Sequence, residues 1–133
     1  MSEAARRIDP ASPAGIAGRR VLVAEDEALI ALDIELTLTG KGCEVVGPAG
    51  RLDQAIRVAE SETIELAVLD VMLGRDDVHP LAELLAERGV PFVFHSGHGD
   101  PVKLRERFPK AGFVRKPCSP VRLIEALKAV AEG

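Results

Sequence analysis

The chain lacks the features that would point to a membrane, a nucleic acid or a secretory pathway. No apolar stretch approaches the roughly 20 residues needed to span a bilayer, and residues 1–18 lack the apolar centre of a secretory signal. Its 17 basic and 21 acidic residues give a formal net charge of −4, so there is no bulk electrostatic reason to bind nucleic acid. We therefore predict a cytoplasmic protein whose partners are neither membranes nor nucleic acids.

Cysteine and aromatic residues are also scarce. Cys43 and Cys118 stand far apart without metal-ligand spacing, which favours two reduced thiols over a disulfide framework. Tryptophan and tyrosine are absent, so intrinsic fluorescence cannot report on binding. Hydrophobic residues are plentiful, at 47% of a 133-residue chain, which is enough for the core of one domain.

Most of the chain alternates short apolar runs with amphipathic stretches. Residues 1–19 are rich in Ala, Gly, Pro and Arg and are predicted to be a flexible tail, which leaves 20–133 as the domain. Strands are predicted at residues 21–24, 44–47, 66–70, 90–94 and 112–114. Helices are predicted at 28–38, at 52–59, after the polar turn at 74–77, and from 120 to the end.

The first and last predicted helices carry the clearest apolar patterns. In the first, two neighbouring stripes predict a broadly buried helix, and they are formed by Ile30, Ile34 and Leu38 and by Leu29, Leu32 and Leu36. In the last, Ser119 is the expected N-cap and Pro120 the first helical residue.

Two predicted strands end in carboxylates. Residues 21–24 lead into Glu25 and Asp26, and residues 66–69 lead into Asp70. Parallel sheets bind ligands beyond the carboxyl ends of adjacent strands, so the first and third strands should be neighbours. This predicts an α/β fold with a doubly wound, flavodoxin-like, five-stranded parallel sheet of order 2-1-3-4-5. Carboxylates that converge there repel one another, which favours a bound divalent cation such as Mg²⁺.

Four segments in this order resemble the receiver domain of bacterial two-component response regulators. VLVAEDE resembles the first strand with its acidic pair, Glu25 and Asp26, and AVLDVML resembles the strand that carries the phosphoacceptor, here Asp70. FHSGHG places Ser96 where the family has a Ser or Thr, and GFVRKP supplies Phe113 and Lys116. The resemblance covers the chain from about residue 20 to its end.

The resemblance implies a role for each of these residues. Asp70 would accept the phosphoryl group, with Lys116 and the Ser96 hydroxyl contacting its oxygens. Mg²⁺ would be bound by Asp26, Asp70 and the main-chain carbonyl of Met72, and by Glu25 through water. Phe113 stands at the position of the switch aromatic, and the family tends to hold the peptide bond after the lysine cis.

Each residue also has a plainer interpretation. Asp70 could cap a turn, Ser96 could be a turn residue before a glycine, and Phe113 could be fixed in the core. Glu27 is expected to be a solvated residue in the first turn of the first helix rather than a ligand. The histidines His79, His95 and His98 raise the alternative of a transition-metal site, against which stand the undefined loop geometry and the lack of a suitable cysteine.

The FHSGHG segment, followed by Asp100 and Pro101, departs from the common family pattern. It resembles the variant receivers named for a Phe-Ala-Thr-Gly-x-Gly run, which often pair with HWE-type kinases and in which helix four is short or missing. In this chain His95 and Ser96 replace the usual Ala and Thr. Only three sizeable apolar residues lie between Ser96 and Gly112, so we expect a short, poorly anchored helix there.

The resulting hypothesis is a receiver, not an enzyme, that takes phosphate from a sensor histidine kinase or phosphotransfer protein. It would signal through protein contacts or act as a phosphate sink. Three alternatives stay open: a fragment of a longer regulator, an interaction module that never uses phosphate, and a phosphohydrolase of the haloacid-dehalogenase type. The last alternative lacks its general acid, because Met72 stands two residues after Asp70.

Overall fold

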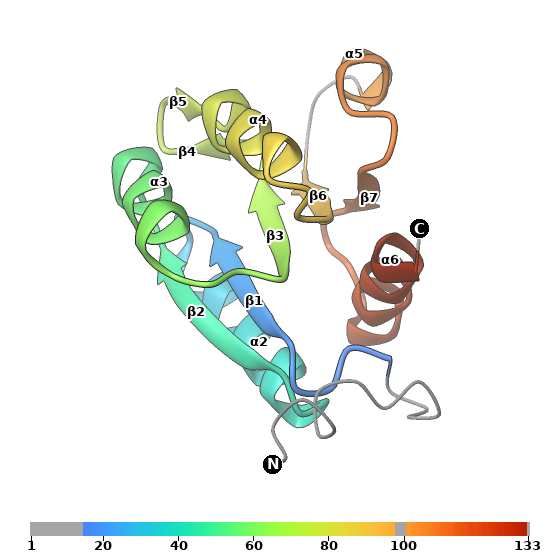
Figure 1. Ribbon diagram of the computed structural model, residues 1–133. Coiled ribbons are helices and arrows are strands. Elements are labelled where there is room, and N and C mark those ends of the chain that lie inside the picture. Colours follow the sequence, from blue (N-terminus) through green and yellow to red (C-terminus); the bar gives the residue numbers. More distant parts are fainter. Residues whose placement is uncertain (1–14, 98–100, 133) are drawn as a thin grey trace.

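The computed structural model describes residues 15–97 and 101–132, and its centre is a parallel sheet between two layers of helices (Figure 1). The sheet consists of β1 (Arg20–Ala24), β2 (Glu44–Ala49), β3 (Leu66–Asp70), β6 (Phe92–Ser96) and β7 (Gly112–Arg115). Its order is β2-β1-β3-β6-β7, and each neighbouring pair is parallel. The predicted order of 2-1-3-4-5 is therefore confirmed.

Alternate strand residues build two separate cores on the two faces of the sheet. One core lies beneath α3 (Leu52–Ser61), α4 (His79–Glu87) and α5 (Pro101–Arg107). The other lies beneath α2 (Ala28–Gly40) and α6 (Pro120–Glu132). All five residues of β3 are buried, because helices cover both faces of this central strand.

The N-terminal boundary of the domain lies before residue 20. Ile16 is fully buried in the core beneath α2 and α6, and the Gly18 amide donates to the Gly42 carbonyl at 2.8 Å. Residues 15–19, assigned to the tail from their composition, thus pack onto the domain. Residues 1–14 lie outside the described part of the chain.

The fourth strand of the sheet, β6, is displaced from its prediction by two residues. It was expected at 90–94, but it begins at Phe92 and runs to Ser96. Val90 instead completes the end of α4, since Gly89 has a φ of 72° and the Val90 amide donates to the Leu85 carbonyl at 2.9 Å. As a consequence, His95 and Ser96 belong to the sheet itself.

A two-stranded hairpin follows Asp70, where the sequence predicted only a polar turn. β4 (Met72–Leu73) pairs antiparallel with β5 (Asp76–Asp77). Gly74 provides the positive φ, 65°, that this tight turn requires. Strands of two residues are too short to leave a periodic signal in the sequence, and for that reason the hairpin was missed.

Helix α2 is buried along only one of its two apolar stripes. Ala31, Ile34 and Leu38 face the core, whereas Leu29, Leu32 and Leu36 are 81%, 48% and 61% exposed. The prediction of a broadly buried helix was wrong, because a helix on the outer layer of the fold has solvent on its far side. The outer leucines, three and four residues apart, form a single exposed stripe, called here the α2 leucine stripe.

The remaining termini and thiols agree with the sequence predictions. The Arg122 amide donates to Ser119 Oγ at 3.2 Å, which confirms Ser119 as the N-cap of α6. Cys43 and Cys118 are free thiols, and burial raises the pKa of Cys43 to about 11. Among the described residues, none of the helices is long and apolar enough to cross a membrane.

Helix α5 is short, as predicted, with seven residues. Two side chains attach it to the core: Leu104 is 8% exposed and Phe108, just after the helix, is 4% exposed. The Phe108 ring lies 5.7 Å from that of Phe92 and 5.8 Å from that of Phe94. Asp100, just before the helix, lies outside the described residues. The attachment of α5 to the core therefore depends on Leu104 and on the Phe108 ring.

Replacing that ring should cost much of the local stability. Because Phe108→Ala removes a buried ring from an aromatic cluster, we expect it to lower the free energy of unfolding by about 3 kcal/mol. Val102→Ala, on the 56% exposed Val102 of the same helix, should change it by about 0.5 kcal/mol or less. Urea unfolding followed by circular dichroism measures both, and equal effects would mean that α5 is not anchored through Phe108.

Candidate functional site

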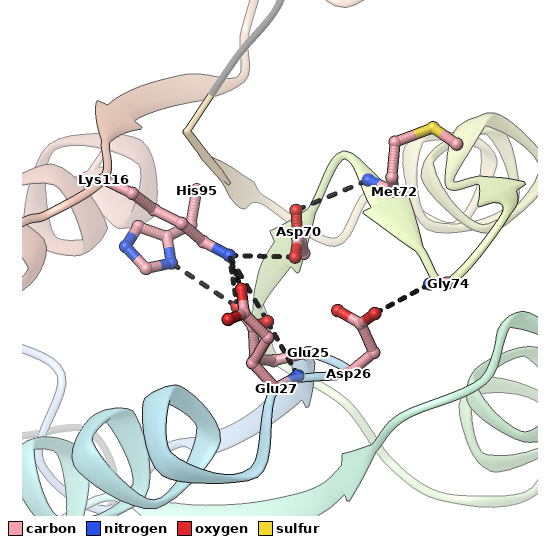
Figure 2. Close-up of polar contacts among 8 residues, drawn as sticks. All are labelled: Glu25, Asp26, Glu27, Asp70, Met72, Gly74, His95 and Lys116. Atoms are coloured by element: carbon pink, nitrogen blue, oxygen red, sulfur yellow. Dashed lines mark hydrogen bonds and ion pairs between the residues drawn. The ribbon is translucent and has the colours of Figure 1, made fainter.

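Four charged or polar side chains converge at the carboxyl end of the sheet (Figure 2). Glu25 follows β1, Asp70 ends β3, His95 lies in β6 and Lys116 follows β7. Each of the four stands two residues after a valine of the core beneath α2 and α6. Because side chains alternate along a strand, all four point to that same face of the sheet. The strand order brings β1, β3 and β6 side by side, and β7 completes the row.

Lys116 is the residue that the carboxylates share. Its Nζ lies 2.9 Å from Asp70 Oδ2, 3.0 Å from Glu25 Oε1 and 3.6 Å from Glu27 Oε1. The Lys116 amide donates to the Ser96 carbonyl at 2.8 Å, and the following bond to Pro117 is cis, as the resemblance implied. The lysine side chain is 14% exposed, so its contacts with these carboxylates are only weakly screened by water.

Glu25 is held as a buried anion. Its side chain is 1% exposed, and its Oε2 accepts from the Glu27 amide at 3.1 Å and from Lys116 Nζ at 3.3 Å. Burial raises the pKa of this carboxyl, but His95, the Glu27 amide and Lys116 outweigh burial and hold it at about 2. For Lys116, burial lowers the pKa, and the bonds to Asp70 and Glu25 raise it above its usual value.

Asp70 behaves in the opposite way. Burial raises its pKa, Lys116 lowers it, and repulsion from Glu25 raises it again, with a result of about 6. The two neighbouring carboxyls thus have pKa values pushed apart, one strongly acidic and one close to neutral. Positive charge next to Asp70 would relieve this repulsion.

The acidic group fits a divalent cation. Glu25, Asp26 and Asp70 each present an oxygen, and these oxygens lie within 4.8 Å of one another. Asp26 is exposed, and the Gly74 amide of the hairpin turn donates to its Oδ2 at 2.9 Å. Glu25 Oε1 is buried without a hydrogen bond. Oxygen donors on a partly open crevice are the ligands that Mg²⁺ prefers, so the residues present match the expected cofactor.

The other predicted site residues lie around this group. Met72 begins the hairpin; its amide lies 3.4 Å from Asp70 Oδ1, and the residue is 42% exposed. Ser96 ends β6 and is partly buried. Glu27 is the N-cap residue of α2, rather than part of its first turn, and its side chain is 63% exposed. The site therefore gathers Asp70, Lys116, Glu25 and Asp26 tightly, with Met72 and Ser96 at its edges.

Phe113 lies half-buried in β7, on the opposite face of the sheet from Lys116. Its ring is 5.3 Å from that of Phe94, and the Arg105 guanidinium of α5 lies 4.8 Å from its centre. The ring is thus stacked between β6 and α5.

The histidines do not form a metal site in the described residues. His79 begins α4 and pairs with Asp77, and its ring contacts Phe108 in the core beneath α4 and α5. His95 is buried beside Glu25 on the other face. His98 lies outside the described part of the chain. Sequence reasoning missed the contact of His95 with the acidic group, although its spacing from Val93 was a usable signal.

Comparison with known proteins gives one consistent family. Residues 21–128 match the family model described as the response regulator receiver domain. The chain is 38% identical over 114 residues to the transcriptional regulatory protein PdtaR of Mycobacterium tuberculosis, covering 83% of the chain and 55% of PdtaR. It is 31% identical over 106 residues to the phyllosphere-induced regulator PhyR of Methylorubrum extorquens, covering 77% of the chain and 40% of PhyR.

The fold comparison agrees. The crystal structure of a response regulator receiver protein from Sinorhizobium medicae superimposes with a TM-score of 0.78 at 27% identity, covering 87% of this chain and 96% of that one. The chain spans about half the length of the curated relatives that it matches.

The raised pKa of Asp70 predicts how stability depends on pH. Between about pH 4 and pH 6 the folded state keeps a proton that the unfolded state releases, so the contribution of Asp70 to stability falls as pH rises through this window. Asparagine is uncharged, like the protonated carboxyl that the folded state favours. In metal-free protein, Asp70→Asn should therefore raise the free energy of unfolding by about 1–3 kcal/mol at pH 7.5. At pH 4.5 the change should be about 2 kcal/mol smaller.

Urea unfolding in the presence of a chelator measures this difference. Asp33→Asn on exposed Asp33 removes the same charge from the surface and should show little pH-dependent change. A destabilised Asp70→Asn at pH 7.5 would mean that the Lys116 contact outweighs burial and repulsion.

The geometry also predicts which acids bind a cation. Asp26→Ala removes an oxygen of the acidic group, whereas Glu27→Ala removes an exposed carboxylate directed at Lys116. Mg²⁺ affinity should thus fall far more in the first variant than in the second. Titration of the Asp70 and Met72 amide signals by NMR measures both affinities, and similar losses would contradict the assignment of these two acids.

Proposed function

The chain belongs to the response regulator receiver family, and from this premise we propose that it accepts a phosphoryl group on Asp70 in a two-component phosphorelay. The donor is a sensor histidine kinase or a histidine phosphotransfer protein. The observation that carries the proposal is the 2.9 Å contact between Lys116 Nζ and Asp70 Oδ2, in a crevice where oxygens of three acidic residues lie within 4.8 Å of one another.

The chemistry assigned to Asp70 is nucleophilic. A carboxylate oxygen of Asp70 attacks the phosphorus, the P–N bond of the donor phosphohistidine breaks, and its electron pair remains on the imidazole nitrogen. Mg²⁺, held by Asp26, Asp70 and the Met72 carbonyl, and by Glu25 through water, would supply positive charge next to the transferred group. Lys116 supplies a second positive charge next to the transferred phosphoryl group, and the Ser96 hydroxyl donates a hydrogen bond to a phosphoryl oxygen.

The phosphorylated state is read out near α5. Ser96 and Phe113 are the proposed switch residues: Ser96 moves toward the phosphoryl group, and the Phe113 ring adjusts beside it. Support comes from the position of that ring between Phe94 and the Arg105 guanidinium of α5. A movement of either residue would therefore alter the packing of α5, the short helix that follows β6.

We also propose that the chain belongs to the variant group of receivers named for its Phe-Ala-Thr-Gly-x-Gly run. The FHSGHG segment and the seven-residue α5 support it. In that case the donor is an HWE-type kinase and the protein resides in the cytoplasm with it.

A protein donor also fits the surface of α2. The α2 leucine stripe begins at Leu29, two residues from Glu27, whose carboxylate lies at the mouth of the crevice 3.6 Å from Lys116. A donor that packs on these exposed leucines would reach Asp70 with its phosphohistidine. The receiver would then signal through protein contacts or serve as a phosphate sink.

Two other functions fit the fold less well. A receiver-fold module that binds partners without phosphate would have no need of the carboxylate, lysine and hydroxyl set described above. A phosphohydrolase would need an acid two residues after Asp70, where Met72 stands, so we propose that the chain takes part only in its own phosphorylation and dephosphorylation. Because the chain spans half the length of its relatives, the domain could serve as part of a longer regulator.

Phosphorylation by a small donor tests the proposal directly. Incubation with acetyl phosphate and Mg²⁺ should add the mass of one phosphoryl group to the intact chain, because Asp70 is the carboxylate placed between the cation site and Lys116. The addition should vanish in Asp70→Asn and in the presence of a chelator, and it should persist in Asp33→Asn. A mass increase that survives in Asp70→Asn would refute the assignment of the phosphoacceptor.

A further inference from the structure

His95 is a buried, titratable side chain for which the proposed phosphoryl chemistry gives no role. The residue is 5% exposed, and its Nδ1 has no hydrogen-bond partner. Glu25 Oε1 is likewise buried without a hydrogen bond, and these are the two such side-chain atoms found among the described residues. They face each other across 3.8 Å (Figure 2).

Neither atom has a hydrogen bond, and Glu25 Oε1 has only the ion pair with Lys116 Nζ at 3.0 Å, so the two facing atoms point to a bond that forms in another state of the site. A buried donor or acceptor without a partner is costly, and folded proteins rarely leave one unpaired. The gap of 3.8 Å is too long for a hydrogen bond, and a closure of about 1 Å would bring it to normal length. The question is what would cause that closure.

Lys116 supplies the cause. Without phosphate, its Nζ lies 3.0 Å from Glu25 Oε1 and 2.9 Å from Asp70 Oδ2, so Glu25 has a cation beside it. When Lys116 pairs with a phosphoryl oxygen, as the proposed function requires, that cation moves away from Glu25. Glu25 Oε2 keeps the Glu27 amide as a donor, but Oε1 is left without a positive neighbour.

We propose that His95 is a positioning residue: it forms a hydrogen bond with Glu25 when Lys116 moves from Glu25 to the phosphoryl group. An imidazole with a proton on Nδ1 donates a hydrogen bond to Glu25 Oε1, so the exchange replaces an ion pair with a hydrogen bond and transfers no proton. Glu25 then competes less strongly for Lys116, which strengthens the contact between Lys116 and the phosphoryl group. This inference rests on the proposed function, and it concerns a residue at which the variant group commonly has alanine.

The surroundings of His95 permit this movement. Its backbone is fixed in the sheet, opposite Asp70 on β3 and Val114 on β7. Its ring borders a cavity of about 420 Å³ between α2 and α6, lined also by Ile30 and Leu123. The strand thus holds the backbone of His95 in register, while the cavity leaves space beside its side chain.

Two conservative variants separate the hydrogen bond from packing. Asparagine carries an amide nitrogen at the same distance along the side chain as Nδ1, so His95→Asn should preserve the donor. Glutamine carries its amide one carbon farther out, so His95→Gln should lose it. His79→Gln, the same change at the partly exposed His79, serves as the matched control.

The measurement is the affinity for beryllofluoride, a phosphoryl mimic, in the presence of Mg²⁺, followed by amide NMR of the full chain. His95→Gln should bind beryllofluoride about fivefold or more weakly, whereas His95→Asn and His79→Gln should stay within about twofold of the original chain. Affinity for Mg²⁺ alone should change little in all three, because Lys116 remains beside Glu25 without the mimic. In the original chain, the side-chain ¹⁵N spectrum of His95 should show a protonated Nδ1 once beryllofluoride is bound.

The outcomes are distinct. If His95→Gln binds beryllofluoride as well as the original chain, or if His95→Asn is as weak as His95→Gln, the positioning role is refuted while the proposed function stands. A proton found on Nε2 in the bound state refutes it as well. If the original chain takes no phosphoryl group from acetyl phosphate, the proposed function fails, and this inference fails with it.

Discussion

One ammonium group shared between two buried carboxylates is the interaction on which the site depends. Glu25 and Asp70 cannot both be charged at close range without a cation, and Lys116 is the cation within 3.0 Å of each. The sharing leaves the two acids unequal, with one pKa held at about 2 and the other raised to about 6. One positive charge therefore serves two carboxylates. A second cation near Asp70, or a group that binds Lys116, would change the charge balance around both acids.

The parallel sheet is what makes that sharing possible. Residues 46 positions apart in the chain, Asp70 and Lys116, meet within 2.9 Å because each follows a strand whose carboxyl end lies at the same edge. The β4–β5 hairpin after Asp70 adds a backbone donor, the Gly74 amide, that holds Asp26 from the other side. The strand pairing therefore sets the main-chain position of Asp70 and His95 and of the residues next to Glu25 and Lys116.

Much of this could be predicted from the sequence, because buried parallel strands produce continuous apolar runs and the acids follow them directly. Strand order and the positions of Glu25, Asp26 and Asp70 follow from that pattern, whereas Lys116 was identified through the resemblance of GFVRKP to the receiver family. The remainder depends on information that local patterns do not contain. The α2 leucine stripe is apolar yet exposed, the β4–β5 hairpin is too short to be periodic, and Gly89 ends α4 in a way that delays β6 by two residues. The contact of His95 with Glu25 was missed because the strand was predicted to end at Phe94, one residue before the histidine.

The aromatic cluster has a practical consequence for spectroscopy. The chain has four phenylalanines and no tryptophan or tyrosine, and Phe92, Phe94, Phe108 and Phe113 are in contact with one another in a chain of ring pairs. Apart from the histidines, every aromatic ring thus lies in one place, between the sheet and α5. Shifts of methyl protons caused by phenylalanine ring currents will therefore originate there, so in an unlabelled one-dimensional proton spectrum these shifts report on that corner of the molecule.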